Sequence, residues 1–189
     1  MALCLSFSAL AQSSGLGITA GFTSSQLKLK DLDVKSASGF NAGLMYRLPL
    51  VSGLVFQPGL TYNVKGSNWE DLKSQAKFGY VEIPLQLQWG LDLVMLRPYV
   101  FAEPFIGYAV SGKDVSNGSS INMGDIKNRF EYGFGVGGGI DLFDCVQVSA
   151  KYFWNFEDCA LDSYMGRISR ALKERSSFDG IMVSVALFF

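Results

Sequence analysis

Apolar and polar side chains alternate residue by residue in repeated short segments along most of this chain. In residues 81–89, valine, isoleucine, leucine and tryptophan take the odd positions, while glutamate and glutamine take positions 82, 86 and 88. A period of two is that of a β-strand with one apolar and one polar face. Eight such segments follow one another, at residues 16–22, 40–47, 54–65, 81–89, 100–108, 129–142, 146–154 and 180–189. The pattern predicts eight strands, each near the ~9–11 residues that a tilted membrane strand needs.

The connections between these segments alternate between long and short. The long ones cover residues 24–37, 66–75, 111–128 and 155–176, and the short ones cover residues 48–52, 90–96 and 143–145. Short periplasmic turns alternating with longer outer loops are typical of outer-membrane barrels. We therefore predict an all-β fold: an eight-stranded antiparallel up-and-down transmembrane β-barrel with short periplasmic turns and long extracellular loops. Within the fourth long connection, residues 165–173 favour a helix.

Composition supports a membrane location without a membrane helix. Hydrophobic residues make up 49% of the 189 positions and charged residues 17%, against about 25% charged in soluble domains. Mean hydropathy is +0.21, yet no run approaches the ~18 uncharged apolar residues of a spanning helix. A closed barrel is the other structure that satisfies its backbone in lipid, so we expect the outer membrane of a Gram-negative bacterium, with its lipid as a partner. The net charge of −1 offers no basic field, so no nucleic-acid partner is expected.

Aromatic side chains gather near the ends of the predicted strands, on the apolar face. Outer-membrane barrels carry aromatic girdles at both membrane interfaces, and the residues in such places are Tyr46, Tyr62, Trp89, Tyr108, Phe130, Tyr132, Tyr152 and Trp154. A soluble calycin-type ligand-binding barrel would have the opposite polarity, with its polar face outside. Alternation alone leaves both barrels open, and the aromatic ends favour the membrane barrel.

Both terminal segments add to this interpretation. Residues 1–11 resemble the C-terminal part of a secretory signal peptide with an A-x-A site at residues 9–11, which leaves 12–189 as the barrel domain; an ordinary first strand is the alternative. At the other end, the apolar residues of the last strand resemble the signal read by the barrel insertion machinery, which we expect as a partner; an ordinary edge strand is the alternative. These candidate signal residues are Ile181, Val183, Val185, Leu187 and Phe189.

The polar face carries five charged residues that we expect inside the barrel: Glu82, Arg129, Glu131, Asp141 and Lys151. The interior of an eight-stranded barrel is just wide enough for side chains to fill, and charges buried there must pair. The sequence therefore predicts one structural network of three acids and two bases, with no open solute channel. Prolines at positions 58, 84 and 104 are expected to mark β-bulges, which would exchange the two faces beyond them.

Two sequence features bear on catalysis. Histidine is absent, which excludes Ser-His-Asp and Cys-His nucleophile systems and most zinc enzymes, so we expect no enzyme, no metal and no cofactor. Residues 133–138 match G-x-G-x-x-G, but a dinucleotide site needs a helix after the motif, and here strand alternation continues to Leu142. The glycines are better explained as room inside the barrel for bulky neighbours such as Phe101, Phe105 or Phe153.

Four stretches, in this order, resemble the PorT-like outer-membrane β-barrel family of Bacteroidota. They read YVEIPLQLQW, RPYVFAEPFIGY, FEYGFGVGGGIDL and VQVSAKYFWNFED, with Glu103 in place of a usual small residue and Lys151 in place of a usual arginine. The resemblance covers nearly the whole expected mature chain. It implies an outer-membrane location, and one member of the family belongs to a protein-secretion system.

Two functions follow from these observations. The first is a non-enzymatic, integral outer-membrane barrel whose long outer loops bind a protein partner or a surface ligand. The alternative is a subunit of an envelope secretion or assembly complex, as the resemblance allows.

Overall fold

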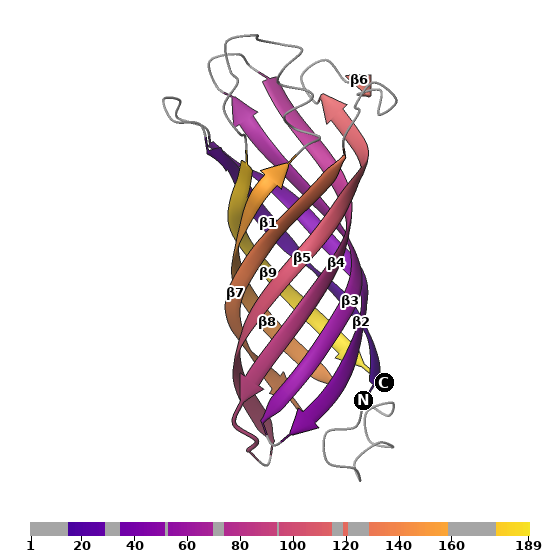
Figure 1. The fold of residues 1–189 in the computed structure, drawn as a ribbon, viewed down its shortest axis with the longest axis vertical. Coiled ribbons are helices and arrows are strands. Elements are labelled where there is room, and N and C mark those ends of the chain that lie inside the picture. Colours follow the sequence, from indigo (N-terminus) through magenta and orange to yellow (C-terminus); the bar gives the residue numbers. More distant parts are fainter. Residues whose placement is uncertain are drawn as a thin grey trace.

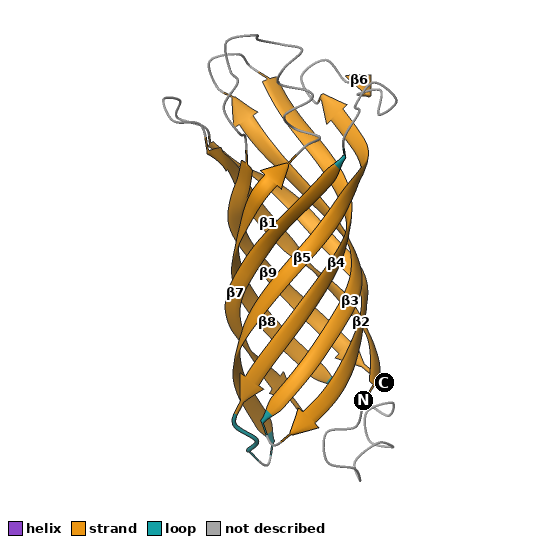
Figure 2. Cartoon of the chain, viewed as in Figure 1, coloured by secondary structure: helices purple, strands orange, loops and turns teal. Residues whose placement is uncertain are grey.

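The chain folds into a closed wall of β-strands, and the described residues contain no helix (Figure 2). The computed structural model describes residues 15–28, 35–51, 53–69, 74–93, 95–114, 119–120, 129–158 and 177–189. Its strands are β1 (Gly15–Lys28), β2 (Lys35–Val51), β3 (Leu54–Trp69), β4 (Ser74–Gly90), β5 (Leu96–Asp114), β6 (Ser119–Ser120), β7 (Phe130–Leu142), β8 (Val146–Asp158) and β9 (Ser177–Phe188). No helix within these ranges is long and apolar enough to cross a membrane.

Eight of these strands form an antiparallel barrel in which neighbours in the chain are neighbours in the wall (Figure 1). The first and last strands close it, in a register that runs from Gly17 opposite Phe188 to Lys28 opposite Ser177. The two-residue strand β6 pairs only with the end of β5 and stands outside the ring. The eight-stranded fold predicted from alternation is therefore confirmed. The helix expected at residues 165–173 and the signal peptide expected at 1–11 lie outside the described residues.

The strands are longer than predicted. The eight barrel strands have 12 to 19 residues, and β5 begins at Leu96 rather than at residue 100. A tilted strand rises about 2.5 Å of barrel height per residue, so β5 spans about 45 Å, whereas the apolar band of such barrels is about 25 Å tall. The wall therefore extends beyond the lipid.

The outer face is apolar and the inner face is polar, which strand β4 shows residue by residue. Outside, Ile83 and Trp89 are exposed by 43% and 59%. On the opposite face, pointing inward, Glu82, Gln86 and Gln88 are almost fully buried. This is the polarity of a barrel in lipid, and it is opposite to that of the soluble ligand-binding barrel.

Aromatic side chains form a girdle towards the end of the barrel that carries the long connections. Four pairs of rings have centroid distances of 4.8 to 6.2 Å, the range of aromatic contacts: Phe40–Tyr62, Tyr108–Phe130, Tyr132–Phe156 and Tyr152–Trp154. Towards the opposite, short-turn end, Tyr46 and Trp89 face outward. The positions of the aromatic residues thus match the two membrane interfaces expected from the sequence.

The prolines at positions 58, 84 and 104 do not form bulges, contrary to our expectation. The register between β3 and β4 is the same before Pro58 and after it, and that between β4 and β5 is the same on both sides of Pro84. Pro104 likewise leaves the pairing of β5 with β7 unbroken. Each proline removes one ladder donor without adding a residue, so Glu82 and Gln86 stay on the same inner face. The register shifts lie at other places: two next to Gly79 and Gly133, and two in β2, one of which is between Pro49 and Val51.

Strand β7 has a row of inward-facing glycines that makes room for large side chains. Gly133, Gly137 and Gly139 lie directly opposite Phe105, Phe101 and Tyr99 of β5. A Cβ atom on Gly133 would meet the Phe105 ring at 2.4 Å, and one on Gly137 would meet the Phe101 ring at 2.7 Å. The interpretation of G-x-G-x-x-G as space for Phe101 and Phe105 agrees with this packing.

Candidate functional site in the barrel interior

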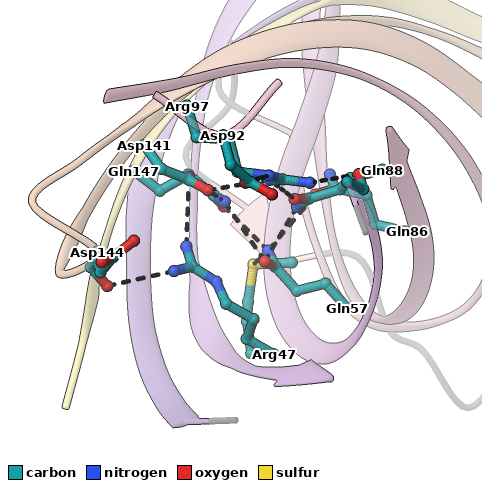
Figure 3. Close-up of polar contacts among 11 residues, drawn as sticks. Arg47, Gln57, Gln86, Gln88, Asp92, Arg97, Asp141, Asp144 and Gln147 are labelled. Atoms are coloured by element: carbon teal, nitrogen blue, oxygen red, sulfur yellow. Dashed lines mark hydrogen bonds and ion pairs between the residues drawn. The ribbon is translucent and has the colours of Figure 1, made fainter. Parts of the chain in front are cut away.

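Buried polar side chains line the barrel from end to end, since the inward positions of neighbouring strands meet at the same height. The first group, which we call the short-turn cluster, closes the end with the short turns (Figure 3). It consists of Arg47, Gln57, Gln88, Arg97, Asp141 and Gln147, all exposed by 4% or less.

Asp141 is the centre of the short-turn cluster. Its two carboxylate oxygens lie 3.2 Å from Nη2 of Arg47 and 3.1 Å from Nη1 of Arg97. Arg97 also donates to the Gly53 carbonyl at 3.0 Å, and Arg47 donates to the Asp144 carbonyl at 3.2 Å. One carboxylate thus holds two guanidinium groups that fasten two of the short turns to the interior.

Glutamine side chains extend this cluster across the barrel, because an amide offers both donors and an acceptor. Gln147 donates to Asp141 at 2.8 Å, Gln57 donates to Gln147 at 2.9 Å, and Gln88 donates to Gln57 at 3.0 Å. From the neighbouring inward position on β4, Gln86 donates to Glu103 at 2.9 Å. The short-turn cluster is therefore connected to the middle of the barrel.

Glu103 forms an ion pair with Lys151 at mid-height. Beside them lies a cavity of about 30 Å³, lined in part by Asn41, Met45 and Ser184. That volume holds one or two waters, so side chains fill most of the cross-section.

The third group, the Lys65 cluster, lies nearer the long-connection end. The Lys65 ammonium is 2.8 Å from Glu82 Oε1 and 3.0 Å from each carboxylate oxygen of Glu131. Three aromatic rings surround it, with centroids 4.7 to 5.2 Å away, and they belong to Tyr80, Phe105 and Phe153. Two carboxylates and three ring faces thus replace the water that a buried ammonium loses.

Charge is balanced across the three groups. Four cations, Arg47, Lys65, Arg97 and Lys151, are paired with four acids, Glu82, Glu103, Glu131 and Asp141. The sequence predicted three acids and two bases in one network. The structure places Glu82, Glu131, Asp141 and Lys151 inside, but divides them among three groups.

Arg129 is the predicted network residue that the structure places elsewhere. It precedes the first residue of β7, so the alternation of the strand does not fix its direction. Its guanidinium carbon is 5.9 Å from the ring centroid of Tyr108, which belongs to the outer girdle. Including Arg129 among the interior charges was wrong.

We accordingly expect Arg129→Ala to reduce barrel stability by less than the ~3–5 kcal/mol that breaking a buried ion pair costs. Urea unfolding in lipid vesicles would measure the change, with Tyr108→Leu as a partner variant that removes the same contact. A loss of stability as large as that expected when a buried acid loses its partner would show that Arg129 does belong to the interior network.

The sequence contained the signal for most of the residues that were missed. Arg47, Lys65 and Glu103 all occupy inward positions of their strands, so strand parity alone could have added them. Arg97 could not be found in this way, because the predicted strand began three residues after it.

The five candidate insertion-signal residues of β9 and its end all face outward. They are Ile181, Val183, Val185, Leu187 and Phe189, exposed by 46 to 64%. The intervening Phe188 points inward, where the Arg47 guanidinium lies 3.9 Å over its ring. An outward apolar row is what lipid contact requires, and its recognition by insertion machinery stays a prediction.

Comparison with known proteins adds a family and a fold. Residues 10–160 match the family model of the outer membrane protein β-barrel domain. No curated protein matches the chain.

Among solved structures, Neisserial surface protein A shares 15% identity over 92% of this chain and 97% of its own, with a TM-score of 0.53. The attachment invasion locus protein Ail of Yersinia pestis shares 14% identity over 94% and 99%, with a TM-score of 0.51. The outer membrane enzyme PagL shares 9% identity over 90% and 98%, with a TM-score of 0.55. At such identities the likeness concerns the fold.

The comparison with PagL corrects one expectation. The absence of histidine led us to expect that this chain is not an enzyme. A structure with the same fold is an outer membrane enzyme, so the barrel architecture is shared by enzymes and by other proteins, and that expectation is withdrawn.

Proposed function

Because the chain belongs to the outer membrane protein β-barrel domain family, we propose that it is an outer-membrane barrel with a closed interior whose long outer loops bind a protein partner or a surface ligand. The observation that supports this proposal is the charge-balanced interior. Four ion-paired cations and four ion-paired acids occupy the space that a solute path would need. A partner or ligand would therefore be bound by the outer surfaces of the barrel and not by its interior.

The length of the wall supports the loops as the binding region. Above the girdle residue Tyr108, strand β5 continues to Asp114, and strands β3 and β4 pair as far as Trp69 and Ser74. These extensions are about 15 Å tall and raise the long connections above the lipid surface, where a large partner can reach them.

Cross-linking in intact cells tests the proposal. A photoreactive amino acid would be placed at Ser116 or Ser163 in two long connections, and at Val136 on the lipid-facing wall as a matched control. We expect a discrete protein or polysaccharide adduct from the first two positions and lipid adducts from Val136. Lipid adducts alone from all three positions would contradict the proposed loop function.

We also predict that the purified barrel does not conduct ions as a porin does. Porins with water-filled channels have ~16–18 strands, whereas eight strands leave an interior that side chains fill. Planar-bilayer recording would measure this, and the double variant Lys151→Ala and Glu103→Ala, which enlarges the mid-height cavity, serves as comparison. Porin-like single-channel steps in the unmodified protein would refute a closed interior.

A second proposal is a subunit of an envelope secretion or assembly complex. It rests on the resemblance of four strands to the PorT-like family, and these strands are β4, β5, β7 and β8, which are consecutive in the wall. Detergent extraction without cross-linking distinguishes the two proposals, because a permanent subunit would migrate in native gels as a large complex of fixed composition.

A further inference from the structure

Two neighbouring turns at the short-turn end carry large apolar side chains at their tips. The β4–β5 turn presents Leu91, Leu93 and Met95, exposed by 59%, 57% and 65%, and the β7–β8 turn presents Phe143, exposed by 67%. We call these four residues the apolar turn tips. Figure 1 shows the β4–β5 turn at the lowest point of the barrel wall.

The turn tips are held in place by the fold. The Phe143 amide donates to the Met95 carbonyl at 3.2 Å, which joins one turn to the other. Arg97 Nε lies 3.2 Å from Asp92 Oδ1 and so ties the β4–β5 turn to the interior. The exposure of the tips therefore belongs to a defined conformation.

The β7–β8 turn keeps Phe143 outward at a conformational cost. Phe143 and Asp144 have φ values of 52° and 57°, the left-handed region that a two-residue type I′ hairpin requires at both central positions. Bulky residues rarely adopt it, and asparagine or glycine is usual there. A phenylalanine in this place indicates that its exposed ring has a use.

The apolar surface of the tips is continuous with the lipid-facing wall. On β4, Trp89 faces lipid just before Leu91, and on β5 Leu96 and Val100 continue outward from Met95. The height of the wall between Tyr108 in the outer girdle and Leu96 is about 30 Å, slightly more than the ~25 Å apolar band. The tips therefore lie at the inner boundary of that band.

Among the described residues of the two turns, the charged side chains are those of Asp92 and Asp144. Neither turn has an exposed lysine or arginine among its described residues, and the nearest cations, Arg47 and Arg97, are buried inside the barrel. The half-exposed Asp92 is paired with Arg97, and Asp144 is exposed beside Phe143.

We propose that the apolar turn tips insert into the boundary between headgroups and acyl chains of the periplasmic leaflet, where they fix the depth of the barrel. The occupant of this surface is phospholipid. Apolar side chains in that region gain the free energy of leaving water. The inference is independent of the proposed loop function and rests on the outer-membrane location.

Spin labels test the depth of the tips. Leu93→Cys, Met95→Cys and Phe143→Cys would be made in a full chain whose Cys4, Cys145 and Cys159 are serine, labelled with a nitroxide and reconstituted in phosphatidylethanolamine–phosphatidylglycerol vesicles. Collision rates with oxygen, which concentrates in lipid, and with a nickel chelate, which stays in water, would be compared. Val136→Cys is the lipid control and Ser38→Cys, at the long-connection end, is the water control.

We expect the ratio of oxygen to nickel collisions at the three tips to lie below that at Val136, which is at mid-height of the wall, and to exceed that at Ser38 severalfold. Nickel access equal to that at Ser38 would overturn the proposal. Tips that are open to nickel in vesicles but protected in native outer membranes would also overturn it, in favour of a periplasmic protein as occupant. Heat-modifiable gel migration confirms that each labelled variant is a folded barrel.

Discussion

Replacing Lys65 by methionine is expected to destabilise the barrel by about 3–5 kcal/mol, the cost of removing one partner of a buried ion pair. The Lys65 ammonium is the cation that contacts both Glu82 and Glu131, which are exposed by 2% and 1%. Methionine fills a similar volume but removes the ammonium that lies between the carboxylates of Glu82 and Glu131. Urea unfolding in lipid vesicles, followed by the loss of the fast-migrating gel form, measures the change.

Two controls separate charge from packing at this position. The triple variant Lys65→Met, Glu82→Gln and Glu131→Gln removes all three charges and should recover most of the lost stability, because neutral amides can hydrogen-bond to each other. Lys77→Met, on the outer side of β4, should be nearly neutral. A triple variant as unstable as Lys65→Met alone would show that the ion pairs are not what stabilises this part of the barrel.

The second large effect is expected for Gly137→Ala, which should cost about 3 kcal/mol or more through overpacking. The added Cβ would lie 2.2 Å from the Ala150 carbonyl oxygen and 2.7 Å from the Phe101 ring. The carbonyl belongs to the backbone of the neighbouring strand, so a rotamer change cannot relieve the contact. The yield of heat-modifiable barrel and the urea midpoint both report the loss.

The same strand provides a matched control. Gly135 faces inward two residues away, and a Cβ atom there would meet its nearest neighbour, a carbon of Lys151, at 3.5 Å, an ordinary contact. Gly135→Ala should therefore be neutral, or slightly stabilising since alanine has less freedom in the unfolded chain. Equal losses at Gly135 and Gly137 would mean that strand β7 needs glycine for its backbone conformation and not for space.

Strand number and the two faces could be predicted from the sequence because they depend on a period of two. Along β4 every second residue meets lipid, and a shift by one position would bury Trp89 and expose Glu82. That penalty is repeated in every strand, so the two faces keep their polarity although four of the strands contain proline. Proline removes a donor without adding a residue, which is why Pro84 leaves the faces unchanged.

The partners of the interior charges could not be predicted in the same way. Alternation predicts that Lys65 and Glu131 both point inward, but their contact depends on the height of β3 relative to β7, three strands away around the wall. Arg129 shows a similar limit at the ends of strands. A residue just outside the paired region does not have to follow the inward–outward alternation of the strand. Arg97 was missed because the predicted strand was given the length of a membrane span, whereas the barrel wall is taller and β5 begins at Leu96.

The pairing of charges from distant strands has a consequence for the folding pathway. Lys65 of β3 reaches Glu131 of β7 only when the sheet has curled, and the seam joins β1 to β9, as in the contact between Thr19 and Val185 across 166 residues. If strands entered the bilayer one by one, these ionised side chains would face hydrocarbon without partners, at a cost of several kilocalories per mole each. The curling sheet must therefore keep its concave side in water until the last strand arrives, so that insertion and closure occur as one cooperative event.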